Sequence, residues 1–152
     1  MSGFPNEPNL IIAFSGRKHG NMSLYYGETS EALNNRRIFL SSLGIDYRDL
    51  VCARQIHGDS IRYVTEDDRG SGASAYGGSI ADTDGFITDK KNIPIAVFTA
   101  DCLSVFIYDP LTPSIGLVHC GWRSSKARII SKAIRLMQEK FNARPDNLYA
   151  GF

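Results

Sequence analysis

Two histidines and one cysteine are the residues of this chain whose types could do chemistry together. His57 lies in a Gln-Ile-His-Gly motif, Cys102 follows an aspartate between two apolar runs, and His119 closes a third apolar run. Strand ends commonly carry functional groups at the edge of a rigid sheet. Two imidazoles and a thiolate can supply three protein ligands to a zinc ion, with a fourth position open for water or substrate. Because the three residues are far apart in the sequence, zinc binding is one hypothesis among several.

Other chemistries use the same residue types. Cys102 as a nucleophile with a histidine base would make a thiol hydrolase. A His₂Cys set with a weak axial methionine is the ligand set of blue-copper proteins. A multicopper oxidase is hard to support, because several copper ions need many more imidazoles than the three histidines present. The zinc signature of nucleobase deaminases, His-x-Glu with Pro-Cys-x-x-Cys, is absent.

Apolar runs rich in Val, Ile, Phe and Tyr predict the strands that position these residues. Strands are expected at 10–15, 50–55, 60–65, 95–99, 103–108, 114–119 and 147–152. Helices are expected over 30–43, ended by Gly44, and over 126–141, where apolar residues recur every three or four positions. The chain is therefore predicted to be an α/β (α+β) protein, a mixed sheet with helices packed on it.

Length and composition limit the classes of partner. The 152 residues fit a single domain, 1–152. A net charge of +1 gives no general electrostatic reason to bind nucleic acid or a membrane, and no apolar run approaches the roughly 20 residues of a membrane span. Three cysteines, an odd and sparse set, argue against a disulfide framework and favour a reducing, cytoplasmic compartment. Cys52, inside an apolar run, is interpreted as a small buried hydrophobe.

Four motifs, taken in order, resemble those of a known family. The matching segments are Gln55–Gly58 (QIHG), Ala81–Thr88 (ADTDGFIT), Thr99–Leu103 (TADCL) and His119–Arg123 (HCGWR). Together they resemble the YfiH-like family, long labelled multicopper polyphenol oxidase or laccase domain and now described as purine nucleoside phosphorylases. The resemblance implies a YfiH-like fold, related in architecture to cytotoxic necrotizing factor.

The resemblance also implies a site and an activity. In that family the first motif's His, the second's Cys and the third's His bind one zinc ion, which corresponds here to His57, Cys102 and His119. Cys102 and His119 would then act at the catalytic centre with Arg17, which matches a phosphate-binding arginine of the family's N-terminal loop. The implied reaction is phosphorolysis of adenosine, inosine, guanosine or methylthioadenosine to base and ribose 1-phosphate, with adenosine deamination as a second activity. The expected partners are a purine nucleoside and phosphate, and a homo-oligomer is a further candidate.

Three hypotheses remain as alternatives to a phosphorylase. The protein could edit amino acids of cell-wall precursors, oxidise polyphenols with copper as the weaker metal candidate, or bind zinc without catalysing a reaction. The chain departs from the family pattern at Gly16–Gly20 (GRKHG), where Thr-Arg-Gly-Gly is usual, and at Ser104 and Ser124, where proline and glycine are usual. Family members are longer, so residues 1–152 are expected to be an incomplete domain that lacks its C-terminal part.

Three neighbours of the proposed ligands carry expectations of their own. Cys120 is expected not to bind metal, because it follows His119 on a strand and consecutive strand residues point to opposite faces. Trp122 is interpreted as a core residue rather than a base-stacking platform. Arg123 is interpreted either as a phosphate ligand or as a residue that caps or pairs near the following helix.

Overall fold

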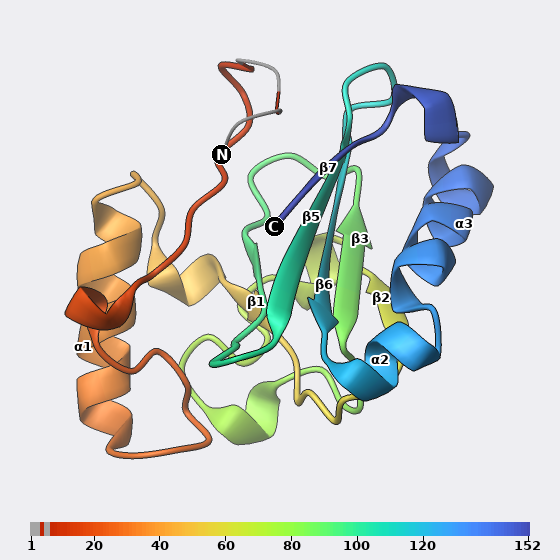
Figure 1. Cartoon of the computed structure of the whole chain (residues 1–152). Coiled ribbons are helices and arrows are strands. Elements are labelled where there is room, and N and C mark those ends of the chain that lie inside the picture. The colour runs from red at the N-terminus through yellow and green to blue at the C-terminus, as the bar shows by residue number, and fades with distance from the viewer. Residues whose placement is uncertain (1–3, 5–6) are drawn as a thin grey trace.

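A five-stranded mixed sheet forms the centre of the protein (Figure 1). The computed structural model describes residue 4 and residues 7–152. The strands are β1 (Val51–Cys52), β2 (Ile61–Tyr63), β3 (Gly85–Thr88), β4 (Ile95–Ala96), β5 (Leu103–Asp109), β6 (Ser114–Cys120) and β7 (Tyr149–Gly151). The main sheet has the order β2-β3-β6-β5-β7, in which only β2 and β3 are parallel neighbours, and β1 and β4 form a separate parallel pair.

The long hairpin of β5 and β6 forms the centre of this sheet, and both strands were predicted from the sequence. Asp109 closes its turn by accepting hydrogen bonds from the backbone N–H of Leu111 and the hydroxyl of Thr112. One face of the hairpin packs against the C-terminal helix. The core on that face is apolar: Ile87, Val105, Ile107, Val118, Ile129, Ala133, Met137, Phe141 and Ala143. Burial of such side chains is the main favourable contribution to folding.

The C-terminal helical region consists of two helices, whereas the sequence predicted one over 126–141. α2 spans Trp122–Lys126 and α3 spans Ile129–Phe141. Arg128 separates them because its backbone is left-handed, with φ at 61°, which no α-helix interior can contain. The predicted end at Asn142 is confirmed, since Asn142 adopts the left-handed conformation of a helix C-cap.

On the side of the sheet opposite α3, the β1–β4 pair packs against β3, and α1 (Thr29–Ser41) packs in turn against β1 (Figure 1). The expected helix over 30–43 is confirmed to within two residues at its end, and Gly44 follows it with φ at 73°. α1 buries an arginine as well as apolar residues: Arg36 is 2% exposed and donates to the carbonyl oxygens of Met22, Gly72 and Ala73. This side chain ties α1 to two loops.

Several predicted strands are shorter than expected and one is absent. Residues 10–15 form no strand; instead Phe14 packs edge-on against Phe106 of β5, with ring centroids 5.0 Å apart. The expected strands at 50–55 and 95–99 keep only two paired residues each. Their remaining residues leave the ladder and become the loops that carry the candidate site.

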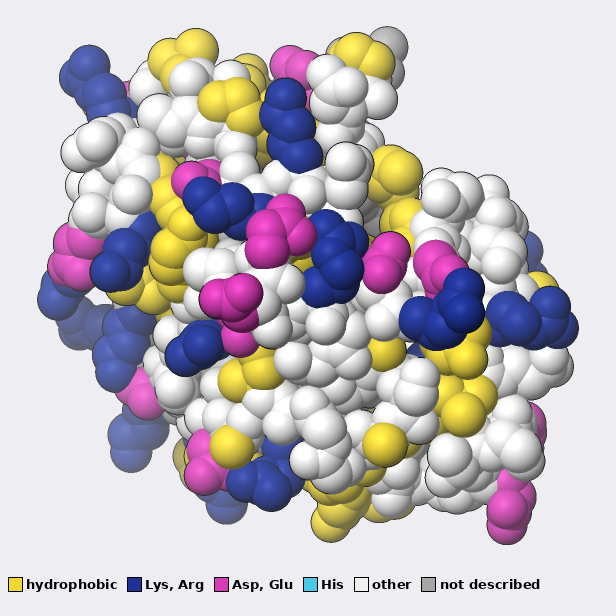
Figure 2. Space-filling view, turned by 180° about the vertical axis from the view of Figure 1, so that it is seen from behind, with side chains coloured by type: hydrophobic (Ala, Val, Ile, Leu, Met, Phe, Trp, Pro, Cys, Tyr) yellow, Lys and Arg dark blue, Asp and Glu magenta, His cyan; other side chains and the backbone are white. Residues whose placement is uncertain are grey.

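Charged side chains of both signs alternate over the middle of the face seen in Figure 2. Exposed ion pairs include Arg69 with Glu66 at 2.8 Å and Arg54 with Asp82 at 3.3 Å. Such pairs contribute little to stability because water screens them. Among the residues that the structure describes, no helix combines the length and apolar character needed to cross a membrane.

Candidate metal centre

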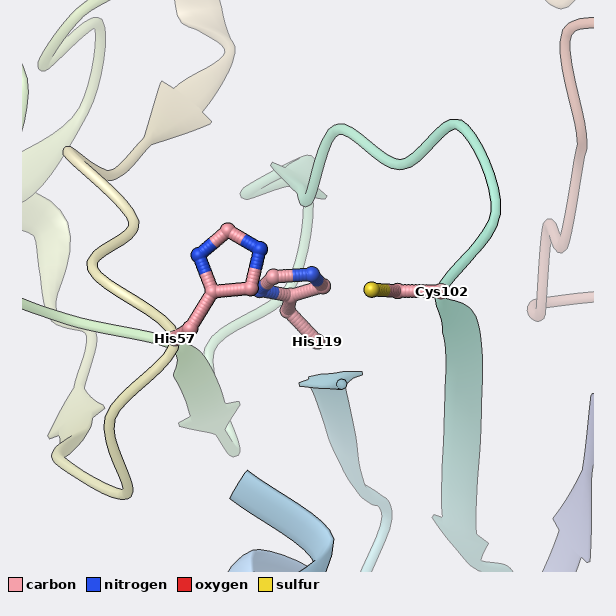
Figure 3. Close-up of side chains that lie close together, drawn as sticks. All are labelled: His57, Cys102 and His119. Carbon is pink, nitrogen blue, oxygen red and sulfur yellow. The ribbon is translucent and has the colours of Figure 1, made fainter. Parts of the chain in front are cut away.

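The side chains of His57, Cys102 and His119 converge at one end of the sheet (Figure 3). One ligand atom from each residue, an imidazole nitrogen or the sulfur, lies within 4.8 Å of the others. The two rings are nearly perpendicular, with centroids 4.7 Å apart. His119 is buried, Cys102 is half-buried and His57 is exposed, so the cluster is open to solvent on the His57 side.

The register of β5 and β6 brings two of these residues together. Ser104 lies opposite His119, and Leu103 lies opposite Cys120. Cys102 precedes the first paired residue of β5, at the edge of the ladder where β6 ends. His57 belongs instead to the loop between β1 and β2, and hydrogen bonds rather than strand pairing must hold that loop in place.

Asp84 holds both histidines. Its carboxylate accepts hydrogen bonds from the backbone N–H groups of Ile56, His57 and Gly58, at 3.1, 2.9 and 2.7 Å. The same carboxylate lies 2.8 Å from Nδ1 of His119, and the carbonyl oxygen of Asp84 accepts from the backbone N–H of His119. His57 has a left-handed backbone, φ 60°, in this loop of consecutive N–H groups directed at one anion.

Asp84 is fully buried, yet its environment favours the ionised form. Burial works to raise the pKa of this carboxyl, but the hydrogen bonds from His119, Gly58, Ile56 and His57 outweigh it and hold the pKa below its usual range. An ionised Asp84 can only accept at His119, so Nδ1 of His119 must carry the ring proton. Nε2 of His119 then presents a free lone pair, which is the state that a metal ligand requires.

Gly121 leaves space for the cluster. A Cβ atom added at this position would lie 3.2 Å from Sγ of Cys102, 3.3 Å from Cδ2 of His57 and 3.9 Å from Nε2 of His119. The three side chains therefore surround the point where any other residue would place its first side-chain atom. The backbone of Gly121 itself, with φ −78° and ψ 174°, is accessible to every residue type.

This donor set fits a metal ion. Two imidazoles and a thiol are the preferred ligands of zinc, and a tetrahedral zinc ion would separate its ligand atoms by about 3.4 Å, inside the 4.8 Å limit of the cluster. The carboxylate–histidine contact of Asp84 with His119 is the usual support of a metal-bound histidine. A tetrahedral ion held by these three side chains would keep its fourth position for water or substrate.

The remaining residues singled out by sequence lie elsewhere. Arg17 is not part of the cluster: it is exposed on the turn Arg17–His19, which packs against α1 through the rings of His19 and Phe39. Cys120 faces away, with Sγ 3.2 Å from Oγ of Ser125 and its side chain against the core under α3. Cys52 is buried, as predicted.

The interpretation of Trp122 as a core residue is wrong. Trp122 opens α2 and is 67% exposed, because the preceding Gly121 takes the buried position against the cluster. The guanidinium carbon of Arg123 lies 4.4 Å from the centroid of the Trp122 ring, so this arginine stacks on its neighbour at the surface.

Asp84 is the functional residue that motif reasoning did not single out. It lies in the ADTDGFIT segment, but nothing local distinguishes it from Asp82, which is exposed. The available signal was an acidic residue directly before an apolar strand, where a buried charge requires partners.

The protein is thus a mixed-sheet α+β protein with a His₂Cys cluster at the end of its central hairpin, and known proteins share its fold. The family model described as multi-copper polyphenol oxidoreductase laccase matches residues 14–152, and the chain belongs to this family, the one that its motifs resemble.

Two relatives and one solved structure illustrate the match. Purine nucleoside phosphorylase YlmD of Bacillus subtilis is 31% identical over 155 residues, covering 95% of this chain and 56% of that protein. An adenosine deaminase from an unknown prokaryotic organism is 28% identical, covering 77% and 45%. The crystal structure of Bacillus licheniformis YfiH superposes with a TM-score of 0.84 at 33% identity, covering 86% of this chain and 49% of that one. The chain thus spans about half the length of the relatives it matches.

Proposed function

We propose that this chain carries the zinc centre of a purine nucleoside phosphorylase, which converts adenosine, inosine, guanosine or methylthioadenosine and phosphate to base and ribose 1-phosphate. The observation that carries the proposal is the convergence of ligand atoms from His57, Cys102 and His119 within 4.8 Å of one another. Asp84 supports it, because its carboxylate contacts Nδ1 of His119 and so leaves Nε2 for the metal. Relatives named as purine nucleoside phosphorylases supply the substrate class.

The residues of the chain divide the task among them. His57, Cys102 and His119 hold the metal, and the cysteine does so as a thiolate rather than as a nucleophile. Asp84 keeps the proton on Nδ1 of His119. A zinc ion bound there would supply Lewis-acid polarisation, and would lower the pKa of a bound water toward about 7.

Arg17 has a separate role in this proposal. A guanidinium binds phosphate with a planar pair of N–H donors, and the exposed position of Arg17 leaves those donors free to reach a dissolved anion. In phosphorolysis the bond from ribose C1′ to the base nitrogen breaks and a bond from C1′ to a phosphate oxygen forms. Arg17 would hold the phosphate while this exchange takes place.

Phosphate-dependent release of hypoxanthine from inosine tests the proposal. The zinc-loaded protein should release hypoxanthine only when phosphate is present, and Cys102→Ala should reduce the release to background. Cys120→Ala is the matched control, since it makes the same chemical change one residue after His119, at a side chain that lies outside the cluster, and it should keep the activity. Release that needs no phosphate, or no release by zinc-loaded protein, contradicts the phosphorylase.

A second activity, adenosine deamination, is proposed on the basis of the relative named as an adenosine deaminase. It would use the same three residues and the same centre, with water rather than phosphate as the nucleophile. Formation of inosine from adenosine in phosphate-free buffer, lost in His119→Ala, is the expected result. Phenol oxidation by copper-loaded protein would favour the laccase alternative, and hydrolysis of a cell-wall precursor would favour the editing alternative.

The compartment that we propose is cytoplasmic. Cys52, Cys102 and Cys120 are all free thiols in the structure, and a metal-binding thiolate must remain reduced. The proposed small-molecule partners, a purine nucleoside and phosphate, are those of the named relatives.

A further inference from the structure

The segment that carries Cys102 has little regular structure of its own. It leaves β4 after Ala96 and joins β5 at Leu103, and residues 99–101 are exposed. Figure 3 shows this segment as an open loop from whose end Cys102 points toward the histidines. The parallel ladder of β1 and β4 stops at Cys52 and Ala96, before either strand reaches its ligand. Main-chain pairing therefore does not fix the Cys102 segment to the His57 segment.

The side chain of Gln55 makes that connection. Its Oε1 accepts a hydrogen bond from the backbone N–H of Phe98 at 2.7 Å, and its Nε2 donates to the carbonyl oxygen of Phe98 at 2.9 Å. The amide thus pairs with Phe98 as a neighbouring strand would. Gln55 lies two residues before His57, and Phe98 lies four residues before Cys102.

The ring of Phe98 contacts Arg36. The guanidinium carbon of Arg36 lies 4.7 Å from the centroid of the Phe98 ring, and Arg36 is held by the carbonyl oxygens of Gly72 and Ala73. A cation–π contact of a buried arginine is stronger than one at the surface. Phe98 is therefore fixed in both its backbone and its ring. A weaker contact, 3.4 Å between the hydroxyls of Thr99 and Ser104, lies further along the loop.

We propose that Gln55 is a positioning residue of the metal centre, whose amide sets the distance of Cys102 Sγ from the two imidazoles. The inference rests on the proposal that the cluster binds a metal ion. Asp84 fixes His57 relative to His119, and Gln55 fixes Cys102 relative to His57, so these two side chains together determine the ligand triangle. Residues that orient metal ligands typically change metal affinity by about 10–100-fold when they are replaced.

Cobalt(II) provides a spectroscopic test, because its thiolate ligand gives a charge-transfer band that reports on Cys102 alone. Gln55→Met keeps the length of the side chain and removes both hydrogen bonds to Phe98. We expect about 10–100-fold weaker Co²⁺ binding and a weakened thiolate band. Gln138→Met makes the same change at an exposed position of α3 and should leave affinity and band unchanged.

A double-mutant cycle distinguishes positioning from general loss of stability. Cys102→Ala leaves two histidines that can still bind Co²⁺ weakly, so its affinity is measured at Co²⁺ concentrations high enough to saturate them. If Gln55 acts through Cys102, then Gln55→Met should weaken Co²⁺ binding much less in this background than in the wild-type protein. Equal losses in both backgrounds, or a wild-type band in Gln55→Met, would overturn the role of Gln55 while leaving the metal centre intact. A wild-type protein that shows no thiolate band would instead overturn the metal centre, and the role of Gln55 with it.

Discussion

Nδ1 of His119 lies 2.8 Å from Oδ1 of Asp84, and both side chains are buried. Through this contact one carboxylate determines which nitrogen of His119 faces the cluster, while its hydrogen bonds to three backbone N–H groups shape the loop of His57. The electrostatics of the site thus centre on a residue that is not itself one of the three ligands.

Replacement of this carboxylate should weaken both the fold and the metal site. Asp84→Asn removes the charge and directs an NH₂ group at donors that need an acceptor. We expect a loss of about 2–4 kcal/mol in the free energy of unfolding, and about 10–100-fold weaker zinc binding. Asp82→Asn, two residues earlier and exposed, is the control and should change neither quantity appreciably. Urea denaturation and chelator competition measure the two effects. Wild-type zinc affinity in Asp84→Asn would disprove the orienting role.

Gly121→Ala should disturb the site without straining the backbone. The new Cβ would lie 3.2 Å from Sγ of Cys102 and 3.3 Å from Cδ2 of His57, so the ligands must shift apart. Overpacking of this kind costs about 1–3 kcal/mol, which corresponds to about 5–150-fold in zinc affinity. Gly77→Ala, where a Cβ meets nothing within 4 Å, is the matched control. Equal zinc affinities of the two variants would show that the cluster is not as close to Gly121 as described.

Much of the fold could be predicted because its signals are local. The runs that became β5 and β6 are continuous and apolar, and α3 shows one apolar stripe that ends at Asn142. The break at Arg128 could not be predicted, since nothing in the sequence around it marks a left-handed residue. Residues 10–15 are apolar enough for a strand, but Phe14 uses its ring rather than its backbone to contact β5.

The candidate site could be predicted only in part, because the ligands lie in short motifs whereas the residues that position them act from distant parts of the chain. His57, Cys102 and His119 belong to short motifs, so their identities are visible in the sequence. The residues that position them, Asp84 and Gln55, act through contacts 27–43 positions away, and such contacts leave no local pattern. The prediction that Trp122 is a core residue is wrong because an aromatic residue after a strand suggests burial, whereas here Gly121 lies against the cluster and Trp122 is exposed.

The stability of the protein should fall at alkaline pH through Cys52. Burial raises the pKa of this thiol from 9.0 to about 11, although the nearby Arg36 cation acts to lower it. In the unfolded chain the thiol ionises near pH 9, whereas in the folded protein it keeps its proton up to about pH 11. Ionisation therefore stabilises the unfolded state relative to the folded state as the pH rises above about 9. The free energy of unfolding should be unaffected by Cys52 below about pH 8 and should lose about 3 kcal/mol between about pH 9 and 11.

Cys52→Ala isolates this contribution. Urea denaturation of wild type and variant at several values between about pH 8 and 11 should show a steeper alkaline loss for the wild type. Cys120→Ala, which removes a half-buried thiol, serves as the control and should retain the wild-type slope. Parallel curves for wild type and Cys52→Ala would contradict the raised pKa.

Strand β7 should make the 152-residue chain prone to self-association. In the described part of the chain β7 is an outer strand that pairs only with β5, and both Tyr149, its first residue, and Phe152, which follows it, are exposed. An open strand edge invites pairing with another chain. Sedimentation velocity should show association that rises with concentration and is reduced by Ala150→Lys, while Leu111→Lys, at an exposed turn, should not reduce it. A compact monomer at all concentrations, with a cooperative melt, would count against this prediction.

Zinc content per chain, measured on four alanine variants, tests the central claim most directly. His57→Ala, Cys102→Ala and His119→Ala should each lose bound zinc, because each removes one of three protein ligands. Cys120→Ala should keep the wild-type content, because its sulfur lies near Ser125 and outside the cluster. Full zinc occupancy in Cys102→Ala would contradict the assignment and restore the alternative in which Cys102 is the nucleophile of a thiol hydrolase.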